Sequence, residues 1–304
     1  MAYHGSRPER AAFEAPTAWL ALAVYGLWFA LTYFYDSLPL GALIALGAWT
    51  IAWQLSLQHE TVHGHPSRML WLNTLIRTWP LALWRPYELY SRSHLAHHFE
   101  PSPDDPETSG FRTAHWARLS PLERAVLRAE STLLGRLVLG PAGEAYRFGR
   151  YAMRRVAAGE RRVGWMLARH TLEAALVLYW VVGICDMPLW LYGLIAYMVS
   201  ALELLGQFAE HRAESGATPR AGTVERAPLL GVLFLNSNLH GAHHLDLSAP
   251  WYRLPEIHRR YRKTILARNG GLVYRSYFDV FRRFLTRPLD APSRFFRGVS
   301  RLGD

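Results

Sequence analysis

The chain has 304 residues, of which 50% are hydrophobic, 13% aromatic and only 19% charged. This composition excludes an intrinsically disordered chain and a small secreted scaffold, and it favours a protein with a large lipid-facing surface. The single cysteine, Cys185, excludes an internal disulfide framework and any cysteine-based zinc or iron–sulfur site within the chain. The formal net charge of +10 comes almost entirely from arginine, with Lys263 as the one lysine. In so apolar a chain it indicates an anionic membrane surface as the partner, not nucleic acid.

Four apolar runs predict transmembrane helices arranged as two hairpins. Each run is long enough, or nearly so, to cross a hydrocarbon core of about 30 Å. Only Asp36 and Ser37 separate the first two runs, and Asp186-Met187-Pro188 separates the last two. Because the first run leads directly into the second, a cleaved signal peptide is the weaker interpretation of it. We therefore expect spanning helices over residues 18–35, 38–58, 165–185 and 187–209.

The basic residues then predict the orientation of the hairpins. The two short connections hold no Arg or Lys, whereas the intervening and flanking segments are rich in Arg. By the positive-inside rule both termini are cytoplasmic, and residues 1–17 and 282–304 form a cytoplasmic arm and a basic cytoplasmic tail. Two shorter apolar patches, 69–84 and 227–235, predict interfacial or buried helices. We expect one all-α integral membrane domain over residues 1–304, with a cytoplasmic helical cap.

Nine of the fourteen histidines fall into four groups. Within each cluster they are three or four residues apart, so their imidazoles project from one side of a helix. Neutral imidazole is a common ligand of iron, zinc and copper, and surface histidines have no reason to cluster so regularly. We therefore predict a metal centre formed by the H-x-x-x-H pair His59 and His63, the H-x-x-H-H box His94, His97 and His98, the lone His211, and the second such box His240, His243 and His244.

The location of these groups argues against a metal transporter. His59 follows the inner end of the second predicted span, and His211 follows the inner end of the fourth. The other two clusters lie in segments predicted to be cytoplasmic. A transporter would place its ligands near the middle of the membrane, where these spans hold almost none.

The order of the four groups on a four-span frame resembles the membrane fatty acid desaturase and hydroxylase superfamily. The resemblance covers about His59 to Pro255, including HETVHGH at 59–65, NSNLH at 236–240 and PWYRLP at 250–255, which look like a bacterial branch. It implies that the nine histidines hold a non-haem di-iron centre, two iron ions that activate dioxygen at the cytoplasmic membrane face.

Polar neighbours of the histidines fit the same resemblance. Asn236 precedes His240 by four residues, and Gln207 precedes His211 by four. Family members often place Asn or Gln at this spacing, so either residue could bind metal directly or through water; alternatively Asn236 caps the last cluster. Glu203 is either a partner that orients an imidazole or an interfacial carboxylate. The remaining histidines are expected to have no ligand role, with His65 the main exception to consider.

One competing interpretation concerns the first histidine pair alone. His59-Glu60-Thr61-Val62-His63 also matches H-E-x-x-H, the zinc metalloprotease motif in which Glu is the general base. Such a site needs only one further ligand, so it leaves at least six clustered histidines unexplained. We keep a membrane zinc metalloprotease as a remote alternative.

The sequence thus predicts oxidation of an unactivated C–H bond, by a fatty acid desaturase acting on acyl-lipid, acyl-CoA or acyl carrier protein. The alternative is a hydroxylase of a lipid, a hydrocarbon or a small amphiphile at the same centre. Because the chain holds no electron-transfer module, a separate ferredoxin, rubredoxin or cytochrome with its reductase must supply electrons. We expect the enzyme in a bacterial inner membrane, surrounded by lipid, with its active site facing the cytoplasm.

Overall fold

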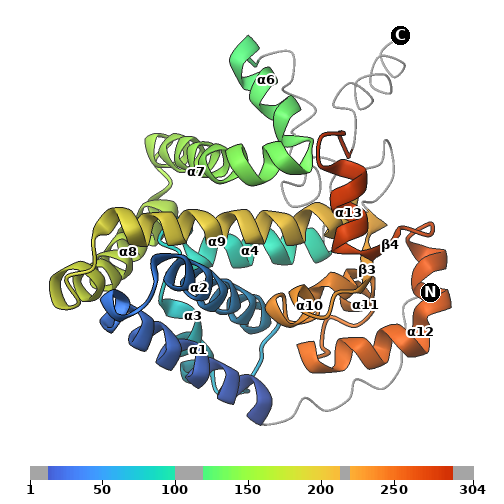
Figure 1. Ribbon diagram of the computed structural model, residues 1–304, viewed down its shortest axis with the longest axis horizontal. Coiled ribbons are helices and arrows are strands. Elements are labelled where there is room, and N and C mark those ends of the chain that lie inside the picture. Colours follow the sequence, from blue (N-terminus) through green and yellow to red (C-terminus); the bar gives the residue numbers. More distant parts are fainter. Residues whose placement is uncertain (1–12, 100–118, 213–219, 290–304) are drawn as a thin grey trace.

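The computed structural model describes residues 13–99, 119–212 and 220–289, and helices make up most of them (Figure 1). Within these residues, four helices are long and apolar enough to cross a membrane. They are α1 (Ala15–Tyr33), α2 (Leu40–Val62), α8 (Arg161–Leu178) with its π-helical continuation η3 (Tyr179–Ile184), and α9 (Leu189–Glu210). The four predicted spans are therefore confirmed, with ends that differ by a few residues. The largest differences are at α2, which continues through His59 to Val62, and at α8, which begins at Arg161. A helical backbone continues beyond the point where the apolar pattern stops.

The two hairpins are tied together at their tips. In the tip between α1 and α2, formed by η1 (Tyr35–Ser37), the Tyr35 hydroxyl donates to the Asp186 carbonyl of the other tip at 3.0 Å. Below the tips, Trp180 Nε1 donates to Thr32 Oγ1 at 2.9 Å. Both tips consequently lie at one end of the molecule, opposite the end where α2 and α9 lead into the cap (Figure 1).

Helices α2 and α9 pack closely at the centre of the bundle. Gly47 makes this approach possible, because a Cβ there would lie 3.1 Å from Ile195 Cδ1. Ile51 and Val199 are fully or almost fully buried nearby. By contrast, large apolar side chains such as Trp19 and Trp190 are 70% and 63% exposed, as expected for surfaces that face lipid. The packing of α2 on α9 fixes the position of the two helix ends that carry His59 and His211.

The remaining helices and four short strands form the cap. Before α8 come α3 (Leu70–Thr78), α4 (Tyr87–Phe99), α6 (Pro121–Glu130) and α7 (Leu133–Ala157). After α9 come β1 (His211–Arg212), β2 (Arg220–Ala221), β3 (Thr223–Arg226), α10 (Leu230–Leu233), η4 (Ser237–Leu239), α11 (His240–Leu245), η5 (Trp251–Arg253), α12 (Leu254–Arg268), β4 (Val273–Ser276) and α13 (Tyr277–Phe284). Strand β1 pairs antiparallel with β2, and β3 pairs parallel with β4. Helices α3 and α10 lie within the two shorter apolar patches.

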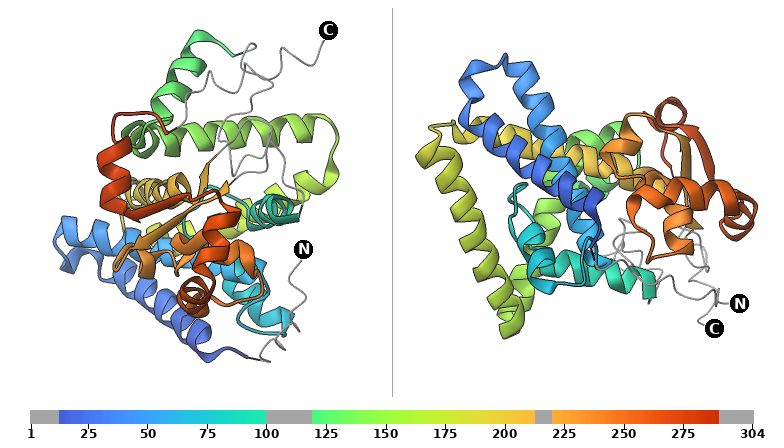
Figure 2. Two further views of the ribbon diagram at one scale, coloured as in Figure 1. Left: turned by 90° about the vertical axis from the view of Figure 1, so that its right-hand side faces the viewer. Right: turned by 90° about the horizontal axis from the view of Figure 1, so that it is seen from below.

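Helix α7 crosses α9 at a wide angle. In the left view of Figure 2, α7 runs across the picture while α9 is seen nearly end-on. Gly140 permits the contact, because a Cβ at this position would lie 2.7 Å from Leu204 Cδ1. The crossing therefore holds the inner part of α9, just before the lone His211, against the cap.

Candidate metal centre

The nine predicted histidines converge in space as two adjoining groups. In each of two quartets, one ring nitrogen per histidine lies within 4.8 Å of the corresponding atoms of the other three. The first quartet is His59, His63, His94 and His243, and the second quartet is His97, His211, His240 and His244. The ninth, His98, lies beside the first quartet, with its Nε2 3.0 Å from that of His94 and 3.1 Å from that of His243. Its ring also lies 4.6 Å from that of His244, so the two groups are neighbours.

Helix geometry explains how each box is divided between the groups. Residues four apart on a helix lie on nearly the same side, so the pairs at this spacing point to one place. Accordingly His59 and His63 of α2 enter one quartet, and His240 and His244 of α11 enter the other. An adjacent residue is rotated by about 100° around the helix axis. His243 therefore joins the first quartet although its neighbour His244 belongs to the second. The H-x-x-H-H pattern supplies two imidazoles to one group and one to the other.

The spacing between imidazole nitrogens fits metal ligation. In the first quartet, the distance between His63 Nε2 and His94 Nε2 is 3.1 Å. In the second quartet the corresponding distance is 3.0 Å for His240 and His244 and 3.2 Å for His97 and His244. Nitrogen ligands about 2.1 Å from one ion, at angles between square and tetrahedral, lie about 3.0–3.4 Å apart. The donor sets thus match what two metal ions require.

Burial prepares these imidazoles to bind metal. It lowers the pKa well below the usual 6.5 in His94, His211, His240 and His243, and neighbouring imidazoles lower it further. The same causes lower the pKa of His244 to about 3. These side chains are therefore neutral at pH 7 and keep a nitrogen lone pair available, which is the form that binds metal.

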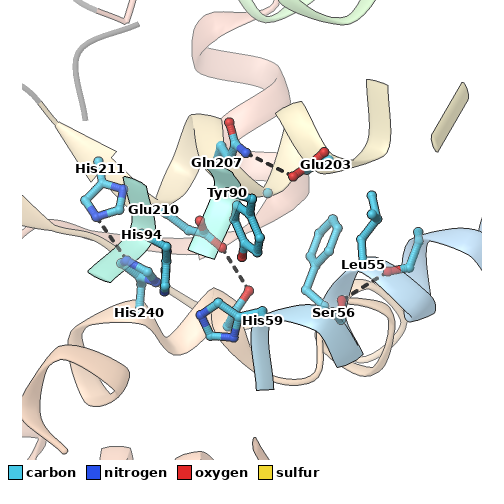
Figure 3. Close-up of a pocket in the computed structure, with 14 residues that line it drawn as sticks. Leu55, Ser56, His59, Tyr90, His94, Glu203, Gln207, Glu210, His211 and His240 are labelled. Carbon is cyan, nitrogen blue, oxygen red and sulfur yellow. Dashed lines mark hydrogen bonds between the residues drawn. The ribbon is translucent and has the colours of Figure 1, made fainter. Parts of the chain in front are cut away.

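A cavity of about 90 Å³ lies against both quartets, at the inner ends of α2 and α9. Ala52 and Leu55 of α2, Gly206 of α9 and Phe234 form its apolar lining. Its polar lining consists of Ser56, Tyr90, Glu203, Gln207, Glu210 and Ser237 together with the imidazoles of His59, His94, His211 and His240. Figure 3 shows Glu210 and Tyr90 beside the imidazoles, with Glu203 and Ser56 farther from His211 and His240. A molecule in this cavity therefore contacts apolar surface and potential metal ligands at the same time.

Glu210 is a lining residue that the sequence interpretation missed. It is the last residue of α9 and immediately precedes His211. Its Oε1 accepts a hydrogen bond from the Ser237 hydroxyl at 2.8 Å. Its signal in the sequence was its position next to a lone histidine at the inner end of a span, but a single Glu at a helix end is too common to be diagnostic.

Glu60 lies behind the first quartet and does not line the cavity. Its Oε2 accepts from the Trp251 backbone N–H at 3.0 Å, and its Oε1 lies 3.7 Å from His59 Nδ1. The carboxylate thus connects the first histidine pair to the segment that follows the last box. A metalloprotease would need this carboxylate beside the substrate, so the arrangement gives that alternative no support.

Asn236 and Gln207 have partners other than an imidazole. The Asn236 amide donates to the Trp251 carbonyl at 3.1 Å, and its side chain forms no cap on η4. Asn236 thus stands at the N-cap position of η4 without the side-chain capping bond of the alternative interpretation, because its amide holds the neighbouring segment. Gln207 lines the cavity but donates along α9 to Glu203 at 3.4 Å, and Glu203 also pairs with Arg85 at 2.5 Å. Metal contact by Asn236 or Gln207 stays a prediction.

The histidines outside the pattern have other roles where the structure describes them. His65 Nδ1 lies 2.6 Å from Glu14 Oε1, His170 Nε2 lies 2.9 Å from the Leu83 carbonyl, and His258 Nε2 lies 3.2 Å from Glu225 Oε1. Neither quartet includes any of the three. His4 and His115 lie outside the described residues.

Comparison with protein families matches residues 35–278 to the family described as "Fatty acid desaturase". The matched region includes all nine histidines and three of the four spans completely. A search of curated proteins finds no match. The four apolar helices together with this match identify an integral membrane protein with a desaturase- or hydroxylase-type oxidoreductase site.

Proposed function

We propose that this chain, which belongs to the fatty acid desaturase family, is an oxygen-dependent di-iron oxidoreductase that acts on an apolar or amphiphilic substrate. The observation that carries the proposal is the pair of adjoining histidine quartets. Two iron ions bound there would supply the reductive activation of dioxygen needed to remove hydrogen from an unactivated C–H bond. The quartets fit two ions by number, spacing and burial of their nitrogens.

The favoured reaction is desaturation of a fatty acyl chain carried on lipid, coenzyme A or acyl carrier protein. Leu55 and Phe234 offer apolar surface to such a chain and exclude water from the site. The cavity, at about 90 Å³, is smaller than the roughly 300–1,000 Å³ of pockets that enclose a whole ligand. The cavity therefore receives the reacting segment of the acyl chain, while the rest of the substrate stays outside the cavity.

Hydroxylation of a lipid, a hydrocarbon or a small amphiphile is the second candidate. The observation that favours it is the polar wall that Ser56, Glu203 and Gln207 contribute to the same cavity. A substrate with a hydroxyl or amide group could hydrogen-bond to this wall, whereas a plain acyl segment could not. Both reactions begin with hydrogen abstraction and differ in whether a second hydrogen leaves or oxygen is inserted.

The electrons are proposed to come from a separate ferredoxin, rubredoxin or cytochrome with its reductase. One cysteine in the chain is too few for an iron–sulfur module of its own. The site, and both termini, are proposed to face the cytoplasm of a bacterial cell. Support comes from the hairpin tips, which hold no Arg or Lys and lie at the end of the bundle opposite the quartets.

The test is mass spectrometry of total lipids and small amphiphiles from cells with and without the protein. We expect a product that has lost two hydrogens for desaturation, or gained one oxygen for hydroxylation, and that requires dioxygen. His97→Ala should abolish the product, because His97 belongs to the second quartet. His258→Ala is the matched control, since His258 pairs with Glu225 and belongs to neither quartet. A product that forms equally well without dioxygen would refute the proposal.

A further inference from the structure

Two metal ions bound in the quartets, as the proposed function requires, would place uncompensated positive charge inside the protein. Neutral imidazoles contribute no negative charge, so two divalent ions would bring about four positive charges into a largely buried site. Several of the imidazoles that surround this site are almost completely buried; His240 and His243, for example, are each 2% exposed. Uncompensated charge in such surroundings is costly, so a nearby carboxylate would stabilise the bound ions.

Among the described residues, three glutamates lie close to the quartets, and their partners distinguish them. Glu203 is neutralised by its ion pair with Arg85 at 2.5 Å. Glu60 lies behind His59 and is held by the Trp251 backbone, outside the cavity. Glu210 lines the cavity, and within the described part of the chain no Arg or Lys forms an ion pair with it. Glu210 is thus the one carboxylate lining this cavity that forms no ion pair among the described residues.

Glu210 lines a cavity that both quartets border, although neither quartet includes it. The same cavity is lined by His59 and His94 of the first quartet and by His211 and His240 of the second. Figure 3 shows the Glu210 side chain directed into this cavity, toward the imidazoles. Ser237 holds one oxygen at 2.8 Å, and Oε2 has no hydrogen-bond partner among the described residues. The side chain is therefore oriented, with one oxygen left to bind a cation.

We propose that Glu210 is an additional, anionic ligand of the metal pair, binding through Oε2 while Ser237 holds Oε1. This inference rests on the proposed function, because it requires metal in the quartets. Carboxylates are suitable ligands for iron, and one carboxylate would reduce the net charge of the centre by one. The nearby hydroxyl of Ser237, three residues before His240, links this ligand to the last histidine box.

The test compares Glu210→Gln with the parent and with Glu203→Gln. Glutamine keeps the size of the side chain and an oxygen for Ser237, but it removes the charge. Glu203→Gln removes the same charge from the same helix and the same cavity, so it controls for long-range electrostatics. After anaerobic loading with ferrous iron, we measure iron content, iron affinity by competition with a chelator, the Mössbauer spectrum and the midpoint potential.

We expect Glu210→Gln to weaken iron binding by at least the roughly 10–100-fold that loss of an outer-sphere partner costs. Its midpoint potential should rise, because an anionic ligand stabilises ferric iron, and its Mössbauer parameters should change. Glu203→Gln should keep an iron affinity within about twofold of the parent. Equal iron affinity, spectrum and potential in Glu210→Gln and the parent would overturn the inference and leave the proposed function standing. A parent chain that binds no iron would instead refute the proposed function.

A second variant keeps the test decisive if Glu210→Gln does not fold, as judged by size-exclusion chromatography and circular dichroism. Glu210→Asp retains the charge, but its side chain is one methylene group shorter, so its carboxylate lies farther from the metal pair. Iron affinity should then fall in Glu210→Asp and remain that of the parent in Glu203→Asp. Equal affinities in these two aspartate variants would overturn the inference.

Discussion

Replacement of Glu60 by Gln separates the proposed oxidation from metal-dependent proteolysis at one side chain. Glu60 is 4% exposed, and its Oε2 accepts from the Trp251 backbone N–H at 3.0 Å. Its Oε1, 3.7 Å from His59 Nδ1, is too distant for a hydrogen bond but close enough to favour one orientation of the imidazole. In an oxidase the residue is therefore a positioning group, whereas in a zinc protease it would be the general base.

The contacts set the size of the effect. A hydrogen bond to a charged acceptor contributes about 1.5–3 kcal/mol and one between neutral groups about 0.5–1.5 kcal/mol. Since Gln keeps an oxygen for Trp251, Glu60→Gln should cost about 1 kcal/mol, or roughly a fivefold change in the population of the correct arrangement. Glu60→Ala leaves the Trp251 N–H without this acceptor and should cost about 1–3 kcal/mol before any loss of packing. Thermal stability should thus decrease from the parent to Glu60→Gln to Glu60→Ala.

The assay is product formed per bound iron, with and without dioxygen and an added electron donor. We expect Glu60→Gln to retain measurable oxidation, reduced by no more than about tenfold, since the positional cost is about 1 kcal/mol. Activity should depend strictly on dioxygen and reductant in every variant. Anaerobic peptide hydrolysis by the parent, lost in Glu60→Gln with the metal still bound, would instead identify a metalloprotease.

Three further predictions concern topology, metal and pH. Reporter fusions near Ser37 and Met187 should lie outside and fusions at both termini inside, because the hairpin tips hold no Arg or Lys; an external C-terminus would contradict this. Purified protein should carry close to two iron atoms per chain. The variants His97→Ala and His243→Ala, one from each quartet, should lose iron and activity together. Full activity in either variant would refute the di-iron centre. In the metal-free protein the pKa of His244 is about 3 when folded and 6.5 when unfolded, so the unfolded chain binds more protons below pH 6.5. Its melting temperature in detergent should therefore fall as the pH is lowered from about 7 to about 5, and a constant value would contradict the burial of the imidazoles.

The features that the sequence predicted correctly are those that depend on local spacing. An apolar run long enough for a membrane favours a helix, because backbone groups in lipid must be satisfied within the segment. The spans therefore appear at the predicted places, and α2 extends past His59 only because helical geometry does not stop with the apolar pattern. In the same way, the spacing in the boxes is enough to predict that the histidines share sides of helices.

Tertiary structure alone decided which side chains meet. Spacing gives the angle of His97 around α4, but only the tertiary arrangement that brings α4, the end of α9 and α11 together assigns it to the quartet of His211. For the same reason Asn236, one turn before a histidine box, is engaged by the Trp251 carbonyl of a later segment. Glu210 had only a weak local signal, its position next to His211, because its importance comes from the cavity that it shares with α2 and α4. A one-dimensional pattern specifies the direction of a side chain from its own helix axis, whereas its partners depend on which other helices the core brings opposite to it.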